Sequence, residues 1–324
     1  MHNPLTYGAR VAVVGAGISG LASAYLLGRQ YAVTLFEAAS YPGGHTNTVD
    51  VTLDGVQHPV DTGFLVFNNH TYPNLISLFS ELGVATHASD MSFSVSMDKG
   101  GLEWAGRDVN SVFAQRRNML SPGFLRMLSE VIRFNSASGR HLQMAEASGC
   151  SLGQLLVQGK YSNTFQNNYL LPMASAIWSS TAADILNFPA TTFLRFCTNH
   201  GLLQIRNRPQ WRTVSGGGRE YVRRMLGKIA DLRLNTPVLQ VCRNKDAVSI
   251  HTPAGTEQFD AVVMAAHAPQ TLRMLDDPSE RERAVIGAIG YQKNKAILHT
   301  DISLLPRQRR AWSAWNYLGT NTAN

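Results

Sequence analysis

The chain has 324 residues, 44% of them hydrophobic and 16% charged, a composition that indicates a globular protein and excludes a disordered or fibrous one. That length exceeds the size of most single-core domains, so we expect two lobes. The net charge of +7 would suit an anionic partner, but no recognised nucleic-acid-binding motif accompanies it, and we predict no nucleic-acid partner.

The first predicted strand leads into a glycine-rich motif. Val11–Val14 is an apolar run typical of a buried parallel strand, and glycines with the spacing G-x-G-x-x-G follow it. In such motifs the first glycine permits a tight turn, the second lets the backbone approach a pyrophosphate, and the third lets the next helix pack against the strand. The candidate phosphate-binding residues are Gly15, Ala16, Gly17, Ile18, Ser19 and Gly20.

The next two elements complete a dinucleotide-binding pattern. Ile18–Arg29 predicts a helix whose N-terminus offers free N–H groups to phosphate, and Ala32–Phe36 predicts a second strand. Glu37 ends that strand about 20 positions after Gly15, as expected for a carboxylate that binds a ribose. We assign ribose contact to Glu37 and include Ala38 among the cofactor-binding residues. An acid at this position argues against a 2′-phosphorylated nucleotide, so FAD and NAD both remain.

Two hairpins and a helix follow. Alternating apolar residues on both sides of Asp54-Gly55 predict a β-hairpin over 45–60. Apolar residues at helical spacing predict a helix over Asn68–Gly83. Ser92–Val95 and Leu102–Trp104 predict the two strands of a second hairpin.

The middle of the chain, from Ser121 to Leu203, has helical periodicity. We predict helices over Gly123–Asn135, Leu152–Gln158, Tyr161–Ala176 and Thr191–Asn199. Methionines and aromatic residues are frequent there. Each of them alone is an ordinary core residue, but together they make a pocket for an apolar substrate plausible. The residues concerned are Met119, Met127, Met144, Met173, Phe124, Phe134, Phe165 and Trp178.

The last third of the chain returns to strands. A glycine-rich turn at Ser215–Gly218 separates a short strand from a predicted helix, and Phe259–Ala266 predicts a fully buried strand. The other predicted elements are strands at Trp211–Val214, Leu232–Leu234, Pro237–Val241, Val248–Thr252 and Tyr291–Thr300, and a helix at Arg219–Ala230.

A second glycine pair narrows the choice of nucleotide. The stretch Tyr41-Pro42-Gly43-Gly44-His45-Thr46 resembles the second fingerprint of the flavin amine oxidase superfamily, which includes monoamine oxidases, protoporphyrinogen oxidases and carotenoid desaturases. The stretches VDTGFLVFNNHTYPNL, LPMASAIWSS, RPQWRTVSGGGREYV and AILHTD resemble one bacterial branch of FAD-binding oxidoreductases, often encoded near enzymes that methylenate membrane fatty acids. The resemblance covers essentially the whole chain and implies FAD as the cofactor.

The resemblance also implies further cofactor contacts. It places the glycine pair and the loop after the first hairpin beside the flavin, gives the backbone of Val238 a hydrogen bond to the adenine, and brings two alanines near the flavin edge. The residues implied are Gly43, Gly44, His45, Thr46, Thr62, Gly63, Phe64, Val238, Ala265 and Ala266.

One catalytic residue is implied in the same way. Lys295 aligns with the lysine that holds a water beside the reactive flavin nitrogen in several amine oxidases. The alternative is an exposed strand lysine without a catalytic role, and Lys293 on the same strand face is a competing candidate.

These observations predict an α/β fold. We expect a Rossmann-like FAD-binding lobe made of residues 1–66 and 205–290, and a discontinuous, mostly helical substrate lobe with a β-sheet made of residues 67–204 and 291–324. Relatives continue into a further strand and a helix that points at the flavin. We expect this chain to be a truncated form that lacks them.

The predicted function is that of an FAD-dependent oxidoreductase. It would remove a hydride from an apolar, fatty-acyl or phospholipid-linked substrate, as a desaturase or oxidase does. An amine oxidase is the main alternative. A flavin-binding protein without catalysis of its own is another, and an NAD-binding protein is disfavoured by the pair Gly43-Gly44.

Cysteines and charge bear on location and partners. Cys150, Cys197 and Cys242 form neither a CxxC pair nor a metal set, so we predict reduced thiols, no metal site and a cytoplasmic protein. The residues before the first strand do not resemble a secretory signal, and no apolar run is long enough for a membrane span. Clustered arginines allow peripheral contact with an anionic membrane, or are simply solvated: Arg206, Arg208, Arg212, Arg219, Arg223, Arg224, Arg307, Arg309 and Arg310.

Overall fold

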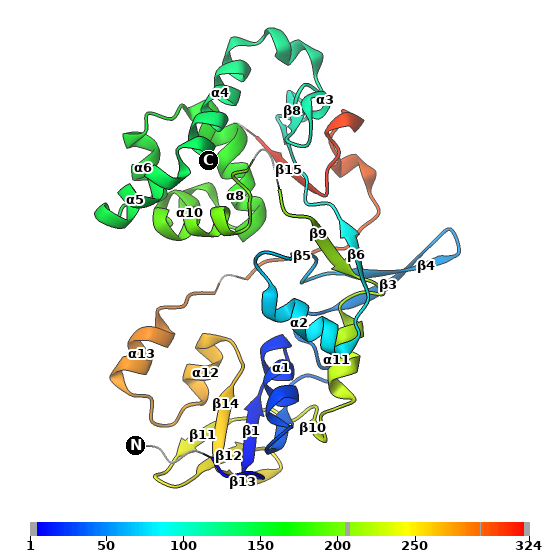
Figure 1. Ribbon diagram of the computed structural model, residues 1–324, viewed down its shortest axis with the longest axis vertical. Coiled ribbons are helices and arrows are strands. Elements are labelled where there is room, and N and C mark those ends of the chain that lie inside the picture. Colours follow the sequence, from blue (N-terminus) through cyan, green and yellow to red (C-terminus); the bar gives the residue numbers. More distant parts are fainter. Residues whose placement is uncertain (1–4, 205–207, 292, 321–324) are drawn as a thin grey trace. The chain divides into compact units, whose positions relative to one another are not determined.

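A computed structural model describes residues 5–204, 208–291 and 293–320, and Figure 1 shows their helices and strands. These residues form two compact units, each assembled from separate stretches of the chain. Unit 1 consists of Met1–Leu65, Asn74–His87 and Thr213–Ile297. Unit 2 consists of Val66–Pro73, Ala88–Arg212 and Leu298–Asn324.

A parallel sheet forms the centre of unit 1. Its strand order is β10-β2-β1-β14, and every neighbouring pair is parallel. The buried run Val11 to Val14 lies in β1, between the two other apolar strands, as its lack of polar residues predicts. The strands are β1 (Arg10–Val14), β2 (Ala32–Phe36), β10 (Asp231–Arg233) and β14 (Ala261–Met264). This arrangement confirms the predicted Rossmann-like fold.

A second sheet of unit 1 packs against the first. Its antiparallel strands have the order β11-β12-β13, and the two sheets share a core cluster. In that cluster the rings of Phe36 and Phe259 meet edge to face, with centroids 5.9 Å apart. The strands are β11 (Gln240–Arg243), β12 (Val248–Thr252) and β13 (Gly255–Phe259).

Helices and one hairpin complete unit 1. The predicted hairpin is confirmed, with Asp54 and Gly55 at positive φ in its turn. Its strands are β3 (Thr48–Leu53) and β4 (Val56–Asp61). The helices are α1 (Ile18–Leu27), α2 (Pro73–Leu82), α11 (Arg219–Leu226), α12 (Ala268–Met274) and α13 (Glu280–Gly287).

Unit 2 combines a small sheet with a group of helices. Its strand order is β15-β7-β8, and β15 runs parallel to β7. The strands are β7 (Phe93–Met97), β8 (Leu102–Ala105) and β15 (Trp315–Gly319). The α-helices are α3 (Val109–Val112), α4 (Pro122–Ser136), α5 (Ser138–Ser148), α6 (Leu152–Gln158), α7 (Asn163–Phe165), α8 (Leu171–Trp178), α9 (Ala182–Asn187) and α10 (Ala190–Asn199).

Shorter elements connect these parts. A π-helical segment, Gln166–Leu170, joins α7 to α8 without a break in the chain's helical path. Turns of 3₁₀-helix occupy Arg116–Leu120, Ile302–Leu304 and Arg309–Ala311. A third small sheet has the order β5-β9-β6, with β5 (Phe67–Asn68), β6 (Thr86–Ser89) and β9 (Trp211–Val214).

The core of unit 2 is rich in aromatic rings from its helices. Phe134 of α4 and Phe165 of α7 are fully buried, with ring centroids 5.6 Å apart, and Tyr161 packs on both rings. The helices α4, α5, α6, α8 and α10 gather around this core in Figure 1. The periodicity of residues 121–203 therefore reflects one shared apolar core.

The structure departs from three local predictions. The helix expected over 68–83 begins only at Pro73, because Oδ1 of Asn68 accepts hydrogen bonds from the N–H groups of His70 and Thr71 and holds a turn there. The helix expected over 161–176 is formed from Asn163 onward, but its middle, Gln166–Leu170, is π-helical. Helix α5 was not expected, because Ser138, Gly139 and Arg140 at its start lack an apolar repeat.

The strand predicted over 291–300 is also absent. Residues 291 and 293–300 belong to no strand, and the side chains of Ile297 and Leu298 are 66% and 50% exposed. A strand is held by hydrogen bonds to a neighbouring strand, and no strand of the described residues pairs with this segment.

The unit boundaries differ from the predicted ones at α2. Residues 74–87 belong to unit 1, although the prediction assigned them to the substrate lobe. The reason is packing on α11: the rings of Phe79 and Tyr221 lie 5.0 Å apart, and the Arg224 guanidinium donates to the Leu82 carbonyl. The other predicted boundaries, at 204/205 and 290/291, lie eight and seven residues before the observed ones, which are at 212/213 and 297/298.

Candidate functional site

The glycine-rich motif forms a tight turn at the carboxyl end of β1. Gly15 has φ +101°, and its N–H donates to the carbonyl of Phe36 over 2.8 Å. Gly20 lies one helical turn into α1, where a Cβ would come within 1.8 Å of the Gly15 carbonyl oxygen. Both positions therefore require glycine for the fold itself.

Gly17 differs from these two glycines. It is the N-cap of α1, and a Cβ at this position would meet no atom within 4 Å. Nothing in the packing of the described residues demands glycine there, so the open space in front of the helix N-terminus fits a bound pyrophosphate. Ile18 and Ser19 on the first turn of the helix are exposed. The geometry thus fits the predicted nucleotide.

Glu37 is tied to the same loop. Its Oε2 accepts the N–H of Ala16 over 2.7 Å, and its Oε1 accepts the N–H of Ala39 over 2.8 Å. A carboxylate has about four acceptor positions, so acceptors remain for the hydroxyls of a ribose. Ala38 is exposed beside it.

The second glycine pair packs directly on the first motif. The Gly43 N–H donates to the Ala16 carbonyl over 2.7 Å, and a Cβ on Gly44 would come within 3.1 Å of the Gly17 Cα. Gly43 and Gly44 both have positive φ, at +118° and +57°. Two motifs about 25 positions apart in the sequence thus form one surface, in accord with the role of close backbone approach in nucleotide binding.

The loop after the first hairpin closes on this pair. A Cβ on Gly63 would lie 1.9 Å from the His45 carbonyl oxygen, which also accepts the N–H of Phe64 over 3.3 Å. The Thr62 N–H donates to the Asn47 carbonyl over 2.9 Å. The structure therefore brings residues 62–64 together with His45, as the prediction requires.

Thr46 is held from the other side. Its hydroxyl lies 2.7 Å from the hydroxyl of Tyr221 on α11, and both residues are buried. Asp61 accepts the Gly218 N–H over 2.9 Å and the Thr48 hydroxyl over 2.6 Å, which ties the glycine-rich turn before α11 to the hairpin. These contacts fix the loop by groups distant in the sequence.

The remaining predicted cofactor residues are Ala265, Ala266 and Val238, which flank strands of unit 1. The Ala265 N–H donates to the Val14 carbonyl over 2.8 Å, so Ala265 and Ala266 follow β14 at the carboxyl end of β1. Val238 lies between β10 and β11, outside any strand, and belongs to the core cluster that contains Phe36. All of them belong to unit 1.

Lys295 is not brought to this group. It lies in the segment 293–300, which forms no strand, and its side chain is exposed, as is that of Lys293. No hydrogen bond or ion pair recorded for the described residues links either lysine to the glycine motifs. Its catalytic role therefore has no support from local geometry in unit 1.

A stack of rings that the sequence pattern does not predict lies beside the glycine pair. The His267 ring is stacked on the His45 ring, with centroids 5.4 Å apart, and on the Tyr291 ring at 4.5 Å. His267 directly follows Ala265 and Ala266, and its place after a predicted strand end was the available signal. Its partner Tyr291 could not be found from spacing.

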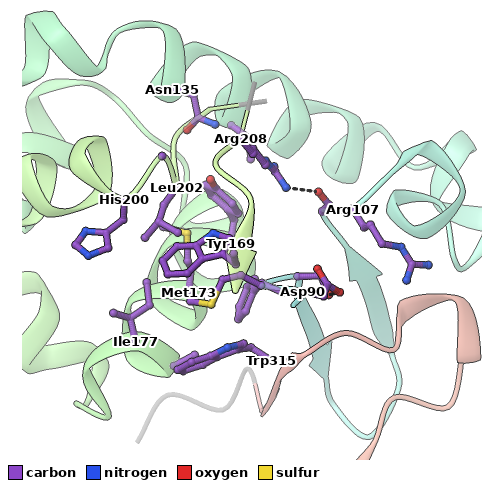
Figure 2. Close-up of a pocket in the computed structure, with 18 of the residues that line it drawn as sticks. Asp90, Arg107, Asn135, Tyr169, Met173, Ile177, His200, Leu202, Arg208 and Trp315 are labelled. Atoms are coloured by element: carbon purple, nitrogen blue, oxygen red, sulfur yellow. Dashed lines mark hydrogen bonds between the residues drawn. The ribbon is translucent and has the colours of Figure 1, made fainter. Parts of the chain in front are cut away.

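Unit 2 contains a cavity of about 670 Å³ (Figure 2). Its apolar wall includes Met91, Phe93, Trp104, Leu128, Val131, Ile132, Met173, Ile177, Leu202, Trp211 and Trp315. Its polar lining includes Asp90, Arg107, Asn135, Tyr169, His200, Arg208 and Gln210. Every lining residue belongs to unit 2.

The residues that were expected to form an apolar pocket lie in three different places: the cavity, the core and the surface. Met173 lines the cavity. Met127, Phe124, Phe134 and Phe165 are core residues with at most 4% exposure. Met119 and Met144 are exposed, at 52% and 37%, and Trp178 packs against Phe188, Phe193 and Phe196.

The described part of the chain contains neither a candidate metal site nor a helix suited to span a membrane. It holds no group of three or more His, Cys, Asp or Glu residues that could bind a metal ion. None of its helices combines the length and apolar character that a membrane crossing needs. The three cysteines are unpaired, and burial raises the pKa of the Cys197 thiol to about 12, which keeps it protonated.

Comparison with known proteins agrees with this geometry. Residues 18–310 match the family of flavin-containing amine oxidoreductases. A Mycobacterium tuberculosis protein named as the flavin-containing monoamine oxidase AofH is 25% identical over 278 residues, which cover 83% of this chain. The chain spans 59% of the length of AofH, so it corresponds to about three fifths of this curated relative.

Solved structures show the same fold. Putrescine oxidase bound to putrescine matches with a TM-score of 0.65 and 21% identity, over 87% of this chain and 64% of that one. The CLA-producing fatty acid isomerase from P. acnes matches with a TM-score of 0.61 and 16% identity, over 88% and 64% of the two chains. From the match over residues 18–310, the chain belongs to the family of flavin-containing amine oxidoreductases, whose cofactor is the predicted FAD.

Proposed function

We propose that this chain binds FAD through unit 1 and takes part in an FAD-dependent oxidation of a small molecule. The observation that carries the proposal is the direct packing of the second glycine motif on the first. Gly43 and Gly44 pack on Ala16 and Gly17, while the space in front of Gly17 stays open. A purely structural turn would not need glycine at an N-cap that faces open space.

Each proposed contact has a physical basis. The first N–H groups of α1 would hold the pyrophosphate, because they have no partner within the helix and lie at its positive end. The free acceptor positions of Glu37 would bind the ribose hydroxyls. The backbone of Val238 would contact the adenine, and Thr62, Gly63 and Phe64 would border the flavin.

The reaction would be a hydride transfer. When bound, FAD supplies a two-electron acceptor for a hydride from a C–H bond of the substrate. The residues of this chain would hold the cofactor, exclude water and orient the substrate. For Lys295 we retain the role of holding a water as a proposal, tested by Lys295→Met, and Lys293→Met tests the competing candidate. Unchanged flavin reoxidation in Lys295→Met would reject it.

We favour an apolar substrate, such as a fatty-acyl or phospholipid-linked chain. The support is the cavity of unit 2, whose wall is formed mainly by methionine, aromatic and aliphatic side chains. One of the structural relatives is named as a fatty acid isomerase, and a fatty acid is a molecule of this kind. Peripheral contact with an anionic membrane would draw on Arg307, Arg309 and Arg310, since Arg219 and Arg223 already pair with acids.

An amine is the second candidate substrate. The names of AofH and putrescine oxidase point to amines, and Asp90 on the cavity wall could pair with an ammonium group. A third possibility is a flavin-binding protein without catalysis of its own. In that case the protein would bind flavin, but neither an apolar substrate nor an amine would reduce it.

The decisive experiment is the visible absorption spectrum of the purified protein, before and after denaturation. Released FAD would support the proposal, and its loss in Gly17→Val would locate the site. A protein without flavin that also fails to take up added FAD would overturn it. A rise in melting temperature with NAD but not with FAD would replace the cofactor by NAD.

A further inference from the structure

The cavity of unit 2 is polar at one place. Tyr169, Asn135 and Arg208 lie there together in Figure 2, and the Asn135 amide and the Arg208 guanidinium both act on the Tyr169 hydroxyl, since each lowers its pKa. Met173 and Ile177, which follow Tyr169 along the same helical path, line an apolar part of the cavity. The cavity is therefore amphipathic, with an apolar body and a polar end.

Arg208 is the most available charge in this lining. Its Nε donates to the Gln204 carbonyl over 2.7 Å and its Nη1 to the Gly106 carbonyl over 3.2 Å. Within the described residues it pairs with no carboxylate, whereas Arg107 forms an ion pair with Asp108 at 3.3 Å. A guanidinium has five N–H donors, so most of those of Arg208 remain for a ligand.

Tyr169 adds a second donor. It is 7% exposed, and burial raises its pKa to about 12, so the hydroxyl stays protonated at neutral pH. Because the hydroxyl stays protonated and Tyr169 lines the cavity, it can donate its O–H proton to an acceptor there.

The backbone around Tyr169 is unusual as well. Tyr169 belongs to the π-helical segment Gln166–Leu170, between α7 and α8. Such segments are rare and often occur at functional sites, because the extra residue re-aims the side chains that follow it. Here the segment presents Tyr169 to the cavity while Phe165, one turn earlier, stays in the core.

We infer that this cavity binds a molecule with an apolar chain and an anionic oxygen-bearing end, held by Arg208 and the Tyr169 hydroxyl. The volume of about 670 Å³ lies within the range of about 300–1,000 Å³ typical of small-molecule sites. A planar carboxylate matches the forked donors of a guanidinium. The inference rests on the proposed function for its reaction, and it names the substrate class.

Asp90 is the competing group. Its carboxylate lines the same cavity, but the Ser92 hydroxyl already donates to it over 2.5 Å. An ammonium at Asp90 would also lie in a lining that carries two guanidinium groups. The net charge of the lining therefore favours an anion over a cation.

The test measures binding of three probes with the same chain: dodecanoate, dodecanol and dodecylamine. Quenching of tryptophan fluorescence reports on the cavity, because Trp104, Trp211 and Trp315 line it. Dodecanoate should bind about tenfold more tightly than dodecanol, as expected for charge-assisted hydrogen bonds. Tighter binding of dodecylamine, or no binding of any probe, would overturn the inference.

Variants locate the contact. Arg208→Gln should remove the preference for dodecanoate and leave dodecanol affinity unchanged, which also shows that the variant is folded. Tyr169→Phe should weaken dodecanoate alone, and Met173→Trp should fill the cavity and weaken all probes. Arg195→Gln is the matched control, since Arg195 pairs with Glu146 and does not line the cavity. Unchanged dodecanoate affinity in Arg208→Gln would refute the assignment.

Two further arms separate this inference from the proposed function. Dodecyl phosphate in place of dodecanoate tells whether the anionic end is a phosphate, as in a phospholipid, or a carboxylate, and either preference supports an anionic ligand. All measurements are made without added FAD. Dodecanoate binding by a protein that never binds FAD would leave this inference standing while the proposed function fails.

Discussion

The backbone N–H of Ala16 donates a 2.7 Å hydrogen bond to Oε2 of Glu37, which joins the first glycine motif to the end of the second strand. The other oxygen of the carboxylate accepts the N–H of Ala39. The acid predicted to bind a ribose thus also fixes the loop that would hold the pyrophosphate. Hydrogen bonds to a charged group contribute about 1.5–3 kcal/mol, so this residue affects both the fold and the ligand.

The first prediction follows from that double role. Glu37→Gln replaces one acceptor by an amide NH₂, which cannot accept from an N–H, so one loop bond is lost. We expect FAD affinity to fall at least about tenfold and the melting temperature to fall as well. Glu37→Lys should abolish binding. The measurements are FAD titration and thermal unfolding. Glu81→Gln is the control, because Glu81 is exposed and forms an ion pair with Arg29 at the surface. Wild-type FAD affinity in both Glu37 variants would contradict the assignment.

The second prediction separates two glycines of one motif. A side chain at Gly17 enters open space, so Gly17→Val should leave the melting temperature of the cofactor-free protein nearly unchanged and block FAD binding. A side chain at Gly20 meets the Gly15 carbonyl at 1.8 Å, so Gly20→Ala should destabilise the protein by about 1–3 kcal/mol even without cofactor. Thermal unfolding with and without FAD distinguishes the two. Equal behaviour of both variants would show that Gly17 is structural.

Local patterns carried most of the fold of unit 1. The apolar run at Val11–Val14, the glycine spacing and the strand 32–36 are short-range signals, and the structure confirms the elements that they predict. The hairpin over residues 48–61 could also be predicted from the sequence, because Asp54-Gly55 favours a turn with positive φ. In each case the residues that determine the element lie within it.

Features that depend on distant partners could not be predicted. A strand was expected over 291–300, yet the described residues of that segment have no neighbouring strand. The cavity of unit 2 draws its wall from residues near 90, 130, 170, 200 and 315, so the methionines of one helical stretch did not reveal it. The stack of His267 on His45 likewise joins residues more than two hundred positions apart. Local sequence patterns cannot predict contacts between residues so far apart in the chain.

The third prediction concerns the buried pair Thr46 and Tyr221. Their hydroxyls lie 2.7 Å apart, and removal of one leaves the other unpaired in the interior. Thr46→Val and Tyr221→Phe should each cost about 1–3 kcal/mol of unfolding free energy, and the double variant should cost less than the sum. Urea unfolding gives the three values. Tyr25→Phe is the control, since its hydroxyl bonds Glu81 at the surface. Strict additivity would show that the pair is not coupled.

The fourth prediction is a dependence of stability on pH. The Arg233 guanidinium donates to Asp231 over 2.9 Å and holds the pKa of that carboxyl below its ordinary value of 3.8. Because the pKa is lower in the folded state, Asp231 contributes stability that is fully present above the unfolded pKa and is lost as the pH falls through the folded one. Asp231 is 40% exposed, so screening by solvent limits the contribution to about 0.2–1 kcal/mol.

Asp231→Asn should therefore lower the melting temperature at neutral pH, and the difference from the wild type should shrink below about pH 4. The measurement is thermal unfolding at a series of pH values from neutral to strongly acidic. Asp246→Asn is the control, because Asp246 is exposed and forms no ion pair within the described residues. A difference that stays constant, or grows as the pH falls, would show that the bond to Arg233 does not stabilise β10 on the edge of the parallel sheet.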